Sequence, residues 1–251
     1  MIQVKNSAKS AEIYISGDII DDADGEEVKA WYGDDASGYK WPDSVKNELD
    51  AIDDDAPLTV YINSDGGSVP AGIAIANMIA RHKGETTAIV DGWCCSIATQ
   101  VFFAADHRII PENAYLMIHK PSTIAIGDAD DLHQAAHALD VIQKGLETTY
   151  NAHALDGVSP DEIHDMVEST TWLTGEDAAK FFDVEVKEAT QTAACVGGAL
   201  HMLGDLPNGI QLADTSNKKA HDVPKVDRAV NVEDKDSFKK RVAVAIALAK
   251  A

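Results

Sequence analysis

The chain has 251 residues, of which 45% are hydrophobic and 25% are charged. These values are typical of a globular protein and exclude a chain that is disordered throughout. No run of about 18 apolar residues occurs, and the first residues lack a basic and then apolar pattern, so we expect no membrane span, no secretory signal and an intracellular, cytoplasmic protein.

The charge is unevenly distributed along the chain, whose formal net charge is −21. Residues from Gln211 onward carry nine Lys/Arg and six Asp/Glu, a net charge of +3, whereas the preceding residues carry twelve and thirty-six, a net of −24. Such an acidic body repels polyanions and anionic lipid surfaces. We therefore expect neither a nucleic acid nor a membrane as a partner.

Alternating apolar residues predict strands, and apolar residues spaced three and four apart predict helices. In chain order these patterns predict strand 12–16, loop to residue 38, helix 42–52, strand 58–63, helix 68–82, strand 86–90, helix 96–105, strands 107–110 and 114–118, helix 128–155, a helix starting at 159–162, a helix at 174–182 and strand 183–188.

This order of elements indicates an α/β fold with a mostly parallel sheet flanked by helices, because parallel strands need helical crossovers. The pattern dissolves into Gly, Asn, Asp and Pro after Thr190. We therefore predict one domain over residues 1–190, followed by a linker and a basic amphipathic helix within residues 191–251.

Cysteine and histidine spacing indicates no metal centre and no disulfide framework. Two of the three cysteines, Cys94 and Cys95, are adjacent, and adjacent cysteines rarely bridge because the geometry is strained. His133 and His137 are four residues apart, but the segment lacks the glutamate of the HExxH signature. We expect neither a metal nor another cofactor.

Three short segments follow predicted strands, where sites in open α/β sheets commonly lie. The first, residues 63–68, has two glycines before a helix; the second, residues 92–98, contains Ser96; the third, residues 115–121, carries His119. Each has a plain structural reading as well, namely a tight turn, a helix cap and a sheet-edge histidine respectively. Cys94 and Cys95 could also act as nucleophiles, but they lie in an apolar run, where a cysteine is usually inert, so the serine is the better candidate.

Taken together and in this order, the segments resemble the Clp protease proteolytic subunits, and more closely the related phage head maturation (prohead) proteases. Residues 61–67 (YINSDGG) match the family's YINSPGG with Asp65 in place of proline, and residues 117–121 (MIHKP) match MIHQP. A later segment, residues 172–179, is similar to the family's F/W-L-[ST]-A-x-E-A. The resemblance spans about residues 12–188 and implies the repeated β-β-α superhelix that crotonases and Clp proteases share, with an outer helix.

The resemblance also assigns roles to particular residues. It implies Ser96 as the nucleophile, His119 as the general base, and the N–H groups of Gly67 and Ile97 as the oxyanion hole. The family's third group is an aspartate two residues before the aromatic residue of the late segment, and here that position is Thr170.

A threonine cannot offset the charge of an imidazolium, so the sequence does not identify the acid that would complete a catalytic triad. Either Glu168 or Asp165 supplies the carboxylate, or the enzyme works with a Ser–His dyad.

The resemblance implies a serine endopeptidase acting on protein and peptide substrates inside a homo-oligomeric ring. The helix predicted at 128–155 is our candidate for a contact between subunits. For a prohead protease the substrates would be capsid, portal or scaffold precursors, processed in the host cytoplasm or inside the assembling prohead. The basic C-terminal helix would then bind the acidic scaffold or shell, and would itself be cut off during maturation.

Four alternatives remain at this point. The chain could be a housekeeping, ATP-dependent Clp-type subunit, or a crotonase that stabilises an enolate with paired backbone N–H groups. It could also be a catalytically dead ring subunit, or a Ser–Lys peptidase whose base is Lys120 or Lys144.

Overall fold

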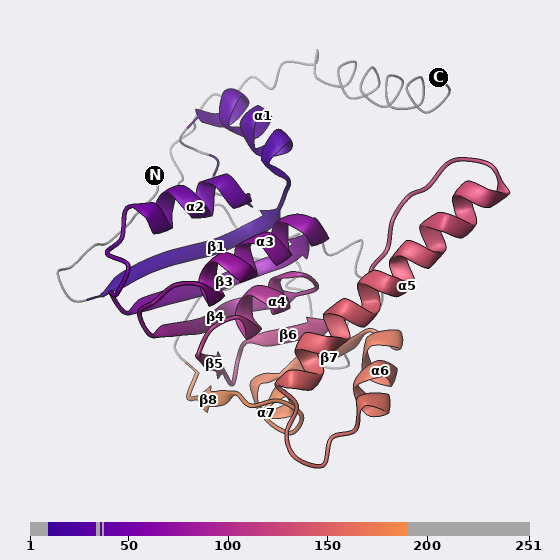
Figure 1. Cartoon of the computed structure of the whole chain (residues 1–251). Coiled ribbons are helices and arrows are strands. Elements are labelled where there is room, and N and C mark those ends of the chain that lie inside the picture. Colours follow the sequence, from indigo (N-terminus) through magenta and orange to yellow (C-terminus); the bar gives the residue numbers. More distant parts are fainter. Residues whose placement is uncertain (1–9, 34–35, 37, 190–251) are drawn as a thin grey trace, which may run out of the picture. The chain divides into compact units, whose positions relative to one another are not determined.

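A computed structural model describes residues 10–33, 36 and 38–189 (Figure 1). The predicted linker, the predicted C-terminal helix and Cys195 lie outside the described residues, so the proposed domain boundary stays a prediction. The elements are, in chain order, β1 (Ala11–Ile19), α1 (Asp22–Tyr32), β2 (Tyr39–Lys40), α2 (Pro42–Asp50), β3 (Leu58–Gly67), α3 (Val69–Ala80), β4 (Thr86–Cys95), α4 (Ala98–Phe103), β5 (His107–Pro111), β6 (Tyr115–Ile118), α5 (Ala129–Ala152), α6 (Pro160–Glu168), β7 (Thr171–Thr174), α7 (Gly175–Ala178) and β8 (Glu185–Lys187).

The strands form one sheet, which confirms the predicted α/β architecture with a mostly parallel sheet. Its main path runs β2-β1-β3-β4-β5-β8, and every neighbouring pair on this path is parallel. The end of β4 leaves β5 and pairs with β6 instead, and β6 pairs in turn with the antiparallel β7. The sheet therefore forks at β4, so that the last residues of this strand have β3 on one side and β6 on the other.

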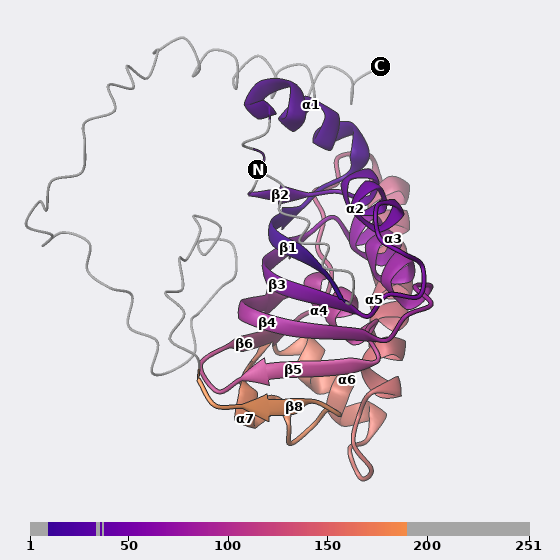
Figure 2. The same cartoon turned by 90° about the vertical axis from the view of Figure 1, so that its left-hand side faces the viewer.

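The core lies between the sheet and the helices on one of its faces. Alternate residues of β1, β3 and β4 are buried, among them Ile13, Val60 and Val90. Figures 1 and 2 show α2 and α3 against that face, and α3 contributes the buried Ile75 and Ile79. The alternation that predicted the strands therefore marks which face is covered.

Two segments differ from the sequence prediction because tertiary pairing overrides local turn signals. The acidic stretch predicted as a loop contains α1, in which Gly25 is the buried residue: a methyl group there would place its carbon 2.4 Å from the Trp41 ring. The turn predicted at Asp91 and Gly92 does not form, because β4 continues through Cys95 and pairs with β6. Gly25 is needed for close packing rather than for ending a helix. The short strands β2 and β7 were not predicted.

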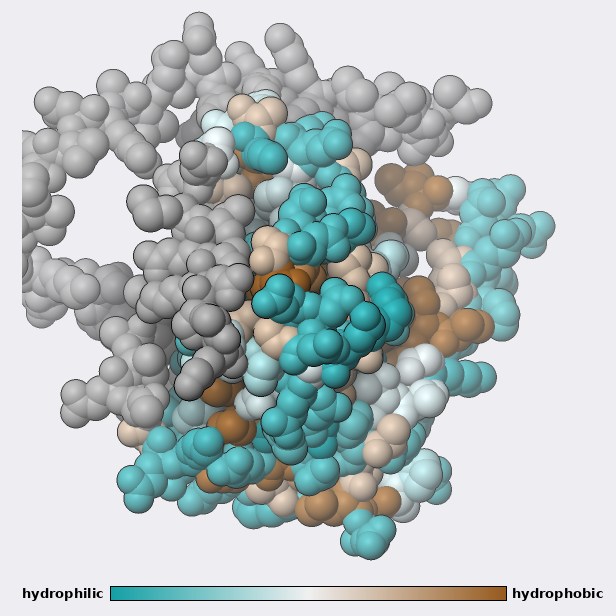
Figure 3. Space-filling model, turned by 60° about the vertical axis from the view of Figure 1, so that its left-hand side comes forward, coloured by the Kyte–Doolittle hydropathy of each residue, from teal (hydrophilic) through white to brown (hydrophobic). Residues whose placement is uncertain are grey.

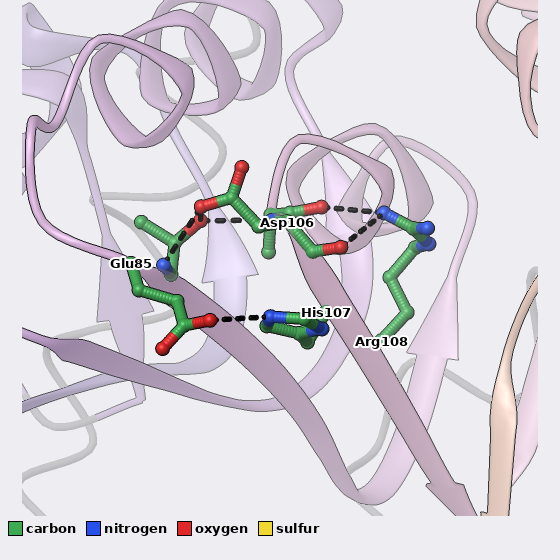
Figure 4. Close-up of polar contacts among 6 residues, drawn as sticks. Glu85, Asp106, His107 and Arg108 are labelled. Atoms are coloured by element: carbon green, nitrogen blue, oxygen red, sulfur yellow. Dashed lines mark hydrogen bonds and ion pairs between the residues drawn. The ribbon is translucent and has the colours of Figure 1, made fainter.

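Polar side chains fix the starts of β4 and β5 (Figure 4). The Asp106 carboxylate accepts hydrogen bonds from the Thr86 backbone N–H at 2.9 Å and from its hydroxyl at 2.8 Å. The Thr86 hydroxyl accepts in turn from the Asp106 N–H. Glu85 and His107 meet at 2.8 Å beside this cluster, and Arg108 donates to backbone carbonyls of residues 105 and 106. These contacts align two parallel strands that share only a short register.

Internal contacts divide the chain into two units. The described part of the first covers residues 10–122 (without 34, 35 and 37) and 139–189, and the described part of the second covers residues 123–138. Ile124, Ile126 and Leu132 of the second unit are exposed.

No helix in the described ranges is both long enough and apolar enough to cross a membrane. Figure 3 shows hydrophilic side chains over most of the described part of one face, with separate hydrophobic patches.

Candidate active site

Ser96 lies directly after β4 in an unusual backbone conformation. Its φ is +55°, and among the described residues Ser96 and Thr170 are the two non-glycine residues with positive φ. The Ser96 N–H donates to the Met117 carbonyl of β6 at 2.9 Å, and its carbonyl accepts from the Thr99 N–H at 3.0 Å. Left-handed backbone at a non-glycine residue is costly and tends to occur at functional sites, where surrounding contacts hold it.

The end of β3 shapes the space beside Ser96. The buried Ser64 hydroxyl donates to the Gly17 carbonyl at 2.6 Å and accepts the Gly66 N–H at 3.1 Å. Asn63 accepts the Trp93 N–H at 3.1 Å and so ties β3 to the last residues of β4. The Asn-Ser pair of the first segment is therefore an anchor, a role that the sequence analysis missed although the motif contained both residues.

Gly66 approaches Ser96 too closely for a side chain to fit. A methyl group at Gly66 would place its carbon 2.6 Å from Ser96 Cβ and 2.8 Å from the Cys95 carbonyl oxygen, and the φ of Gly66 is +99°. Both the contact and the dihedral require glycine there. The sequence analysis gave a role only to Gly67, whose φ of +141° and contact with the Ile19 carbonyl likewise leave no room for a side chain.

His119 follows β6, and its ring reaches Ser96. The distance from His119 Nε2 to Ser96 Oγ is 2.7 Å, although the residues are 23 apart in sequence. Pairing of residues 93–95 with residues 115–117 carries both strand ends to the same place. A buried cluster of Trp93, Cys95 and Met117 packs beneath these ends. The structure therefore brings together two of the residues that the sequence analysis selected.

Burial sets the protonation state of His119. The ring is partly buried, and the loss of solvation lowers the pKa of His119 below its ordinary value of about 6.5. The neutral imidazole therefore prevails at neutral pH. A neutral ring with Nε2 at hydrogen-bond distance from a hydroxyl can accept the proton of that hydroxyl.

The predicted oxyanion donors are Ile97, which follows Ser96 in the chain, and Gly67, which follows Gly66. Ile97 begins the turn into α4, and its N–H donates no hydrogen bond to any residue in the described ranges. Gly67 ends β3, next to the Gly66 that contacts Ser96. An unengaged backbone N–H beside a nucleophile, such as that of Ile97, can stabilise a developing negative charge. The roles of Gly67 and Ile97 stay predictions.

The proposed acids lie on α6, where Glu168 has other partners. Its carboxylate accepts from Lys120 Nζ at 2.7 Å and from Gln143 Nε2 at 3.0 Å, and these contacts lower the pKa of Glu168. No hydrogen bond in the described part of the chain joins Glu168 or Asp165 to His119. The Lys120 ammonium, a candidate base, is thus paired with a carboxylate.

The two adjacent cysteines are buried and free. Burial raises the pKa of both thiols well above the ordinary value. A thiol held in its neutral form is a poor nucleophile, so Ser96 is the better candidate. Among the described residues, no group of three or more His, Cys, Asp or Glu side chains could hold a metal ion, and His133 and His137 belong to none.

Comparison with known proteins places these features in a family. The sequence model of the Clp protease family, described as Clp protease, matches residues 47–182, more than half of the chain. This chain therefore belongs to the Clp protease family and has a Clp-protease-like α/β fold. The matched range contains all three segments that the sequence analysis selected, as well as β7.

Two curated relatives were compared, both described as "ATP-dependent Clp protease proteolytic subunit" and both from strains of Bacteroides fragilis. Each is 29% identical to this chain over 135 residues, which is 53% of this chain. The matches cover 64% and 60% of the relatives' own lengths. The chain thus aligns with less than two thirds of each relative.

Proposed function

We propose that this chain is a serine endopeptidase in which Ser96 is the nucleophile and His119 the general base. The observation that carries the proposal is the 2.7 Å contact between Ser96 Oγ and His119 Nε2. The positive φ of Ser96 and the burial that keeps His119 neutral support it. Membership of the Clp protease family agrees with the same chemistry.

In the first half of the reaction Ser96 Oγ attacks the carbonyl carbon of a peptide bond and passes its proton to His119 Nε2. The carbonyl π electrons move to the oxygen, and the N–H groups of Gly67 and Ile97 stabilise the resulting oxyanion. The intermediate then collapses: the carbonyl reforms, the C–N bond breaks, and the amine leaves with the proton from His119. A donor of this kind contributes about 3–4 kcal/mol to the transition state.

In the second half water hydrolyses the acyl-enzyme ester. His119 takes a proton from the water, whose oxygen bonds to the acyl carbon and forms a second oxyanion. Collapse breaks the bond between that carbon and Ser96 Oγ, and His119 returns the proton to the serine. The carboxylic acid product leaves, and the enzyme regains its starting state. General base catalysis of this type contributes about 10²–10⁴-fold to the rate.

A fluorophosphonate probe tests the proposal, because it modifies serines that a neighbouring base activates. We expect labelling of the full chain at Ser96 and hydrolysis of fluorogenic peptides, both lost in Ser96→Ala and His119→Ala. Ser122→Ala is the matched control, since Ser122 is exposed and outside the proposed site. It should label and cleave as the parent chain does.

The other outcomes separate the alternatives. Labelling that survives in His119→Ala would favour a lysine base, Lys120 or Lys144. Absence of labelling in the parent chain would overturn the proposal and favour a catalytically dead subunit or a crotonase. Against the crotonase stands the hydrogen bond between Ser96 and His119, for which enolate chemistry has no use.

We further propose that the substrates are proteins and that the chain works in a homo-oligomeric ring. Enclosing the sites would protect other proteins from cleavage. The long helix α5 is the candidate contact, because Leu132 and Val141 on it are exposed apolar residues. Light scattering of the full chain, compared with Leu132→Glu, tests this. A parent chain that stays monomeric at micromolar concentration would contradict it.

The biological role has two candidates. The first is processing of capsid or scaffold proteins during phage head maturation, to which the closer motif resemblance points. The second is an ATP-dependent housekeeping peptidase, favoured by the description of the relatives. Incubation with a purified scaffold protein and with an unfolded protein plus a Clp-type ATPase separates them: ATP-independent cleavage of the scaffold supports the first, and ATP-dependent degradation supports the second.

A further inference from the structure

Strand pairing determines which residues lie at the same strand end as His119. β6 and β7 are antiparallel, with Met117 paired to Trp172 and Ile118 paired to Thr171. The paired residues end at Ile118 and Thr171, so His119 is the next residue after β6 and Thr170 is the residue just before β7. The strand pairing thus puts His119 and Thr170 at the same end of the β6–β7 pair.

The backbone at Thr170 is unusual in the same way as at Ser96. Its φ is +54°, a conformation that is rare for a β-branched residue. The Thr170 N–H donates to the Val167 carbonyl at 3.4 Å, which closes the end of α6 just before β7 begins. Of the two left-handed non-glycine residues in the described ranges, Ser96 contacts the His119 ring and Thr170 directly precedes the strand that pairs with β6.

Neither of the two candidate acids on α6, Glu168 and Asp165, has a hydrogen bond to His119 in the described ranges. Glu168 is paired with Lys120 and Gln143, and Asp165 makes no side-chain hydrogen bond in the described ranges. In that part of the chain the His119 ring has one hydrogen-bond partner, Ser96. Charged or titratable groups on the elements around the ring include Asp65 on β3, Asp91, Cys94 and Cys95 on β4, Lys120 after β6, Lys144 and Glu147 on α5, and His164, Asp165 and Glu168 on α6.

We propose that Thr170 occupies the position behind His119 that would hold a triad acid, so that this site operates as a Ser96–His119 dyad with an uncharged positioning residue at 170. Neither Glu168 nor Asp165 then acts as the acid. The proposal deepens the proposed peptidase function and rests on it for its rate effects. Its structural core, the identity of the residue behind the ring, can be measured without turnover.

Titration of the His119 ring by NMR in the full chain tests that core. An aspartate at 170 would place a negative charge beside the ring and stabilise the imidazolium. Thr170→Asp should therefore raise the pKa of His119 by about 1 to 3 pH units. Thr170→Asn is the matched control: asparagine has the same shape and also tolerates positive φ, but carries no charge. It should leave the titration where the parent chain has it.

A second variant tests the rival acid. Glu168→Gln should leave the titration of His119 unchanged, because its carboxylate bonds to other groups. A fall of about one pH unit or more in Glu168→Gln would identify Glu168 as the acid and overturn the proposal. Equal titrations in Thr170→Asp and Thr170→Asn would also overturn it, because position 170 would then not face the ring.

Peptide hydrolysis provides the catalytic readout. If the peptidase proposal holds, Thr170→Asp should exceed Thr170→Asn at pH 7 by about tenfold or more, since an acid behind the histidine supports the imidazolium that forms during the reaction. The two proposals can fail separately. A parent chain that neither labels nor cleaves, combined with the expected titrations, contradicts the peptidase and leaves the assignment of residue 170 intact.

Discussion

The two sides of His119 are built differently. On the nucleophile side, Asn63 and Ser64 tie the strand ends next to Ser96 through buried and partly buried hydrogen bonds, and Gly66 approaches Ser96 so closely that only glycine fits. On the rear side, Thr170 carries no charge, and the neighbouring carboxylate of Glu168 takes part in a partly exposed ion pair with Lys120.

This difference indicates which residues around His119 must be placed within narrow limits and which need not be. The proton has to move between two atoms 2.7 Å apart, so the segments on that side must be placed closely. A group behind the ring acts through charge and orientation, which several arrangements can supply to different extents. The following predictions test this contrast, starting with the largest expected effect.

The first prediction concerns Gly66→Ala on the nucleophile side. The new methyl group would collide with Ser96 and the Cys95 carbonyl, and the backbone φ of +99° adds strain. We expect peptide hydrolysis to fall by about 10²-fold or more, and the free energy of unfolding in urea to fall by about 1–3 kcal/mol.

Gly157→Ala is the matched control, because Gly157 has a φ of +100° and no atom near the added methyl group. It carries the backbone strain without the collision. Equal losses of hydrolysis in the two variants would show that the approach of Gly66 to Ser96 does not matter.

The second prediction concerns pH. Burial lowers the pKa of His119, so the neutral base persists to lower pH than for an ordinary histidine. We expect kcat/KM to fall tenfold per pH unit on the acid side, with a midpoint below about 6.5. A midpoint clearly above that value would indicate a carboxylate paired with the ring and would weaken the contrast between the two sides.

The third prediction concerns Ser64→Ala. The substitution leaves the Gly17 carbonyl and the Gly66 N–H without their buried partner. We expect a loss of about 1–3 kcal/mol in the free energy of unfolding, together with a smaller fall in hydrolysis than Gly66→Ala causes. Ser159→Ala removes a helix cap on α6, and it should lower stability by about 1 kcal/mol without changing the hydrolysis rate.

The smallest effect is expected on the rear side. The pair of Lys120 and Glu168 has side chains that are 53% and 41% exposed, so solvent screens it. Glu168→Gln should leave the urea midpoint of unfolding unchanged within error. A clear loss of stability would mean that the ion pair holds α6 to the strand end and that the rear side is constrained as well.

Much of the fold could be read from the sequence, because alternation and helical spacing are local. The strands around Ile13, Val60 and Val90 follow from that pattern. The helix α1 and the continuation of β4 past Gly92 could not be read, since their glycines look like turn signals. Only the tertiary structure shows that neither glycine ends its element: Gly25 packs against the Trp41 ring, and β4 continues past Gly92 to pair with β6.

For the candidate site, the sequence alone determined the segments and the residue types that could react, Ser96 and His119. Tertiary structure decided that the two meet, that a side chain at Gly66 would collide with the serine, and that Thr170 lies at the strand end beside the one that carries the histidine. The reason is physical: hydrophobic pattern and motif depend on neighbours in the chain, whereas proton-transfer distance and backbone strain depend on how β3, β4, β6 and β7 pair.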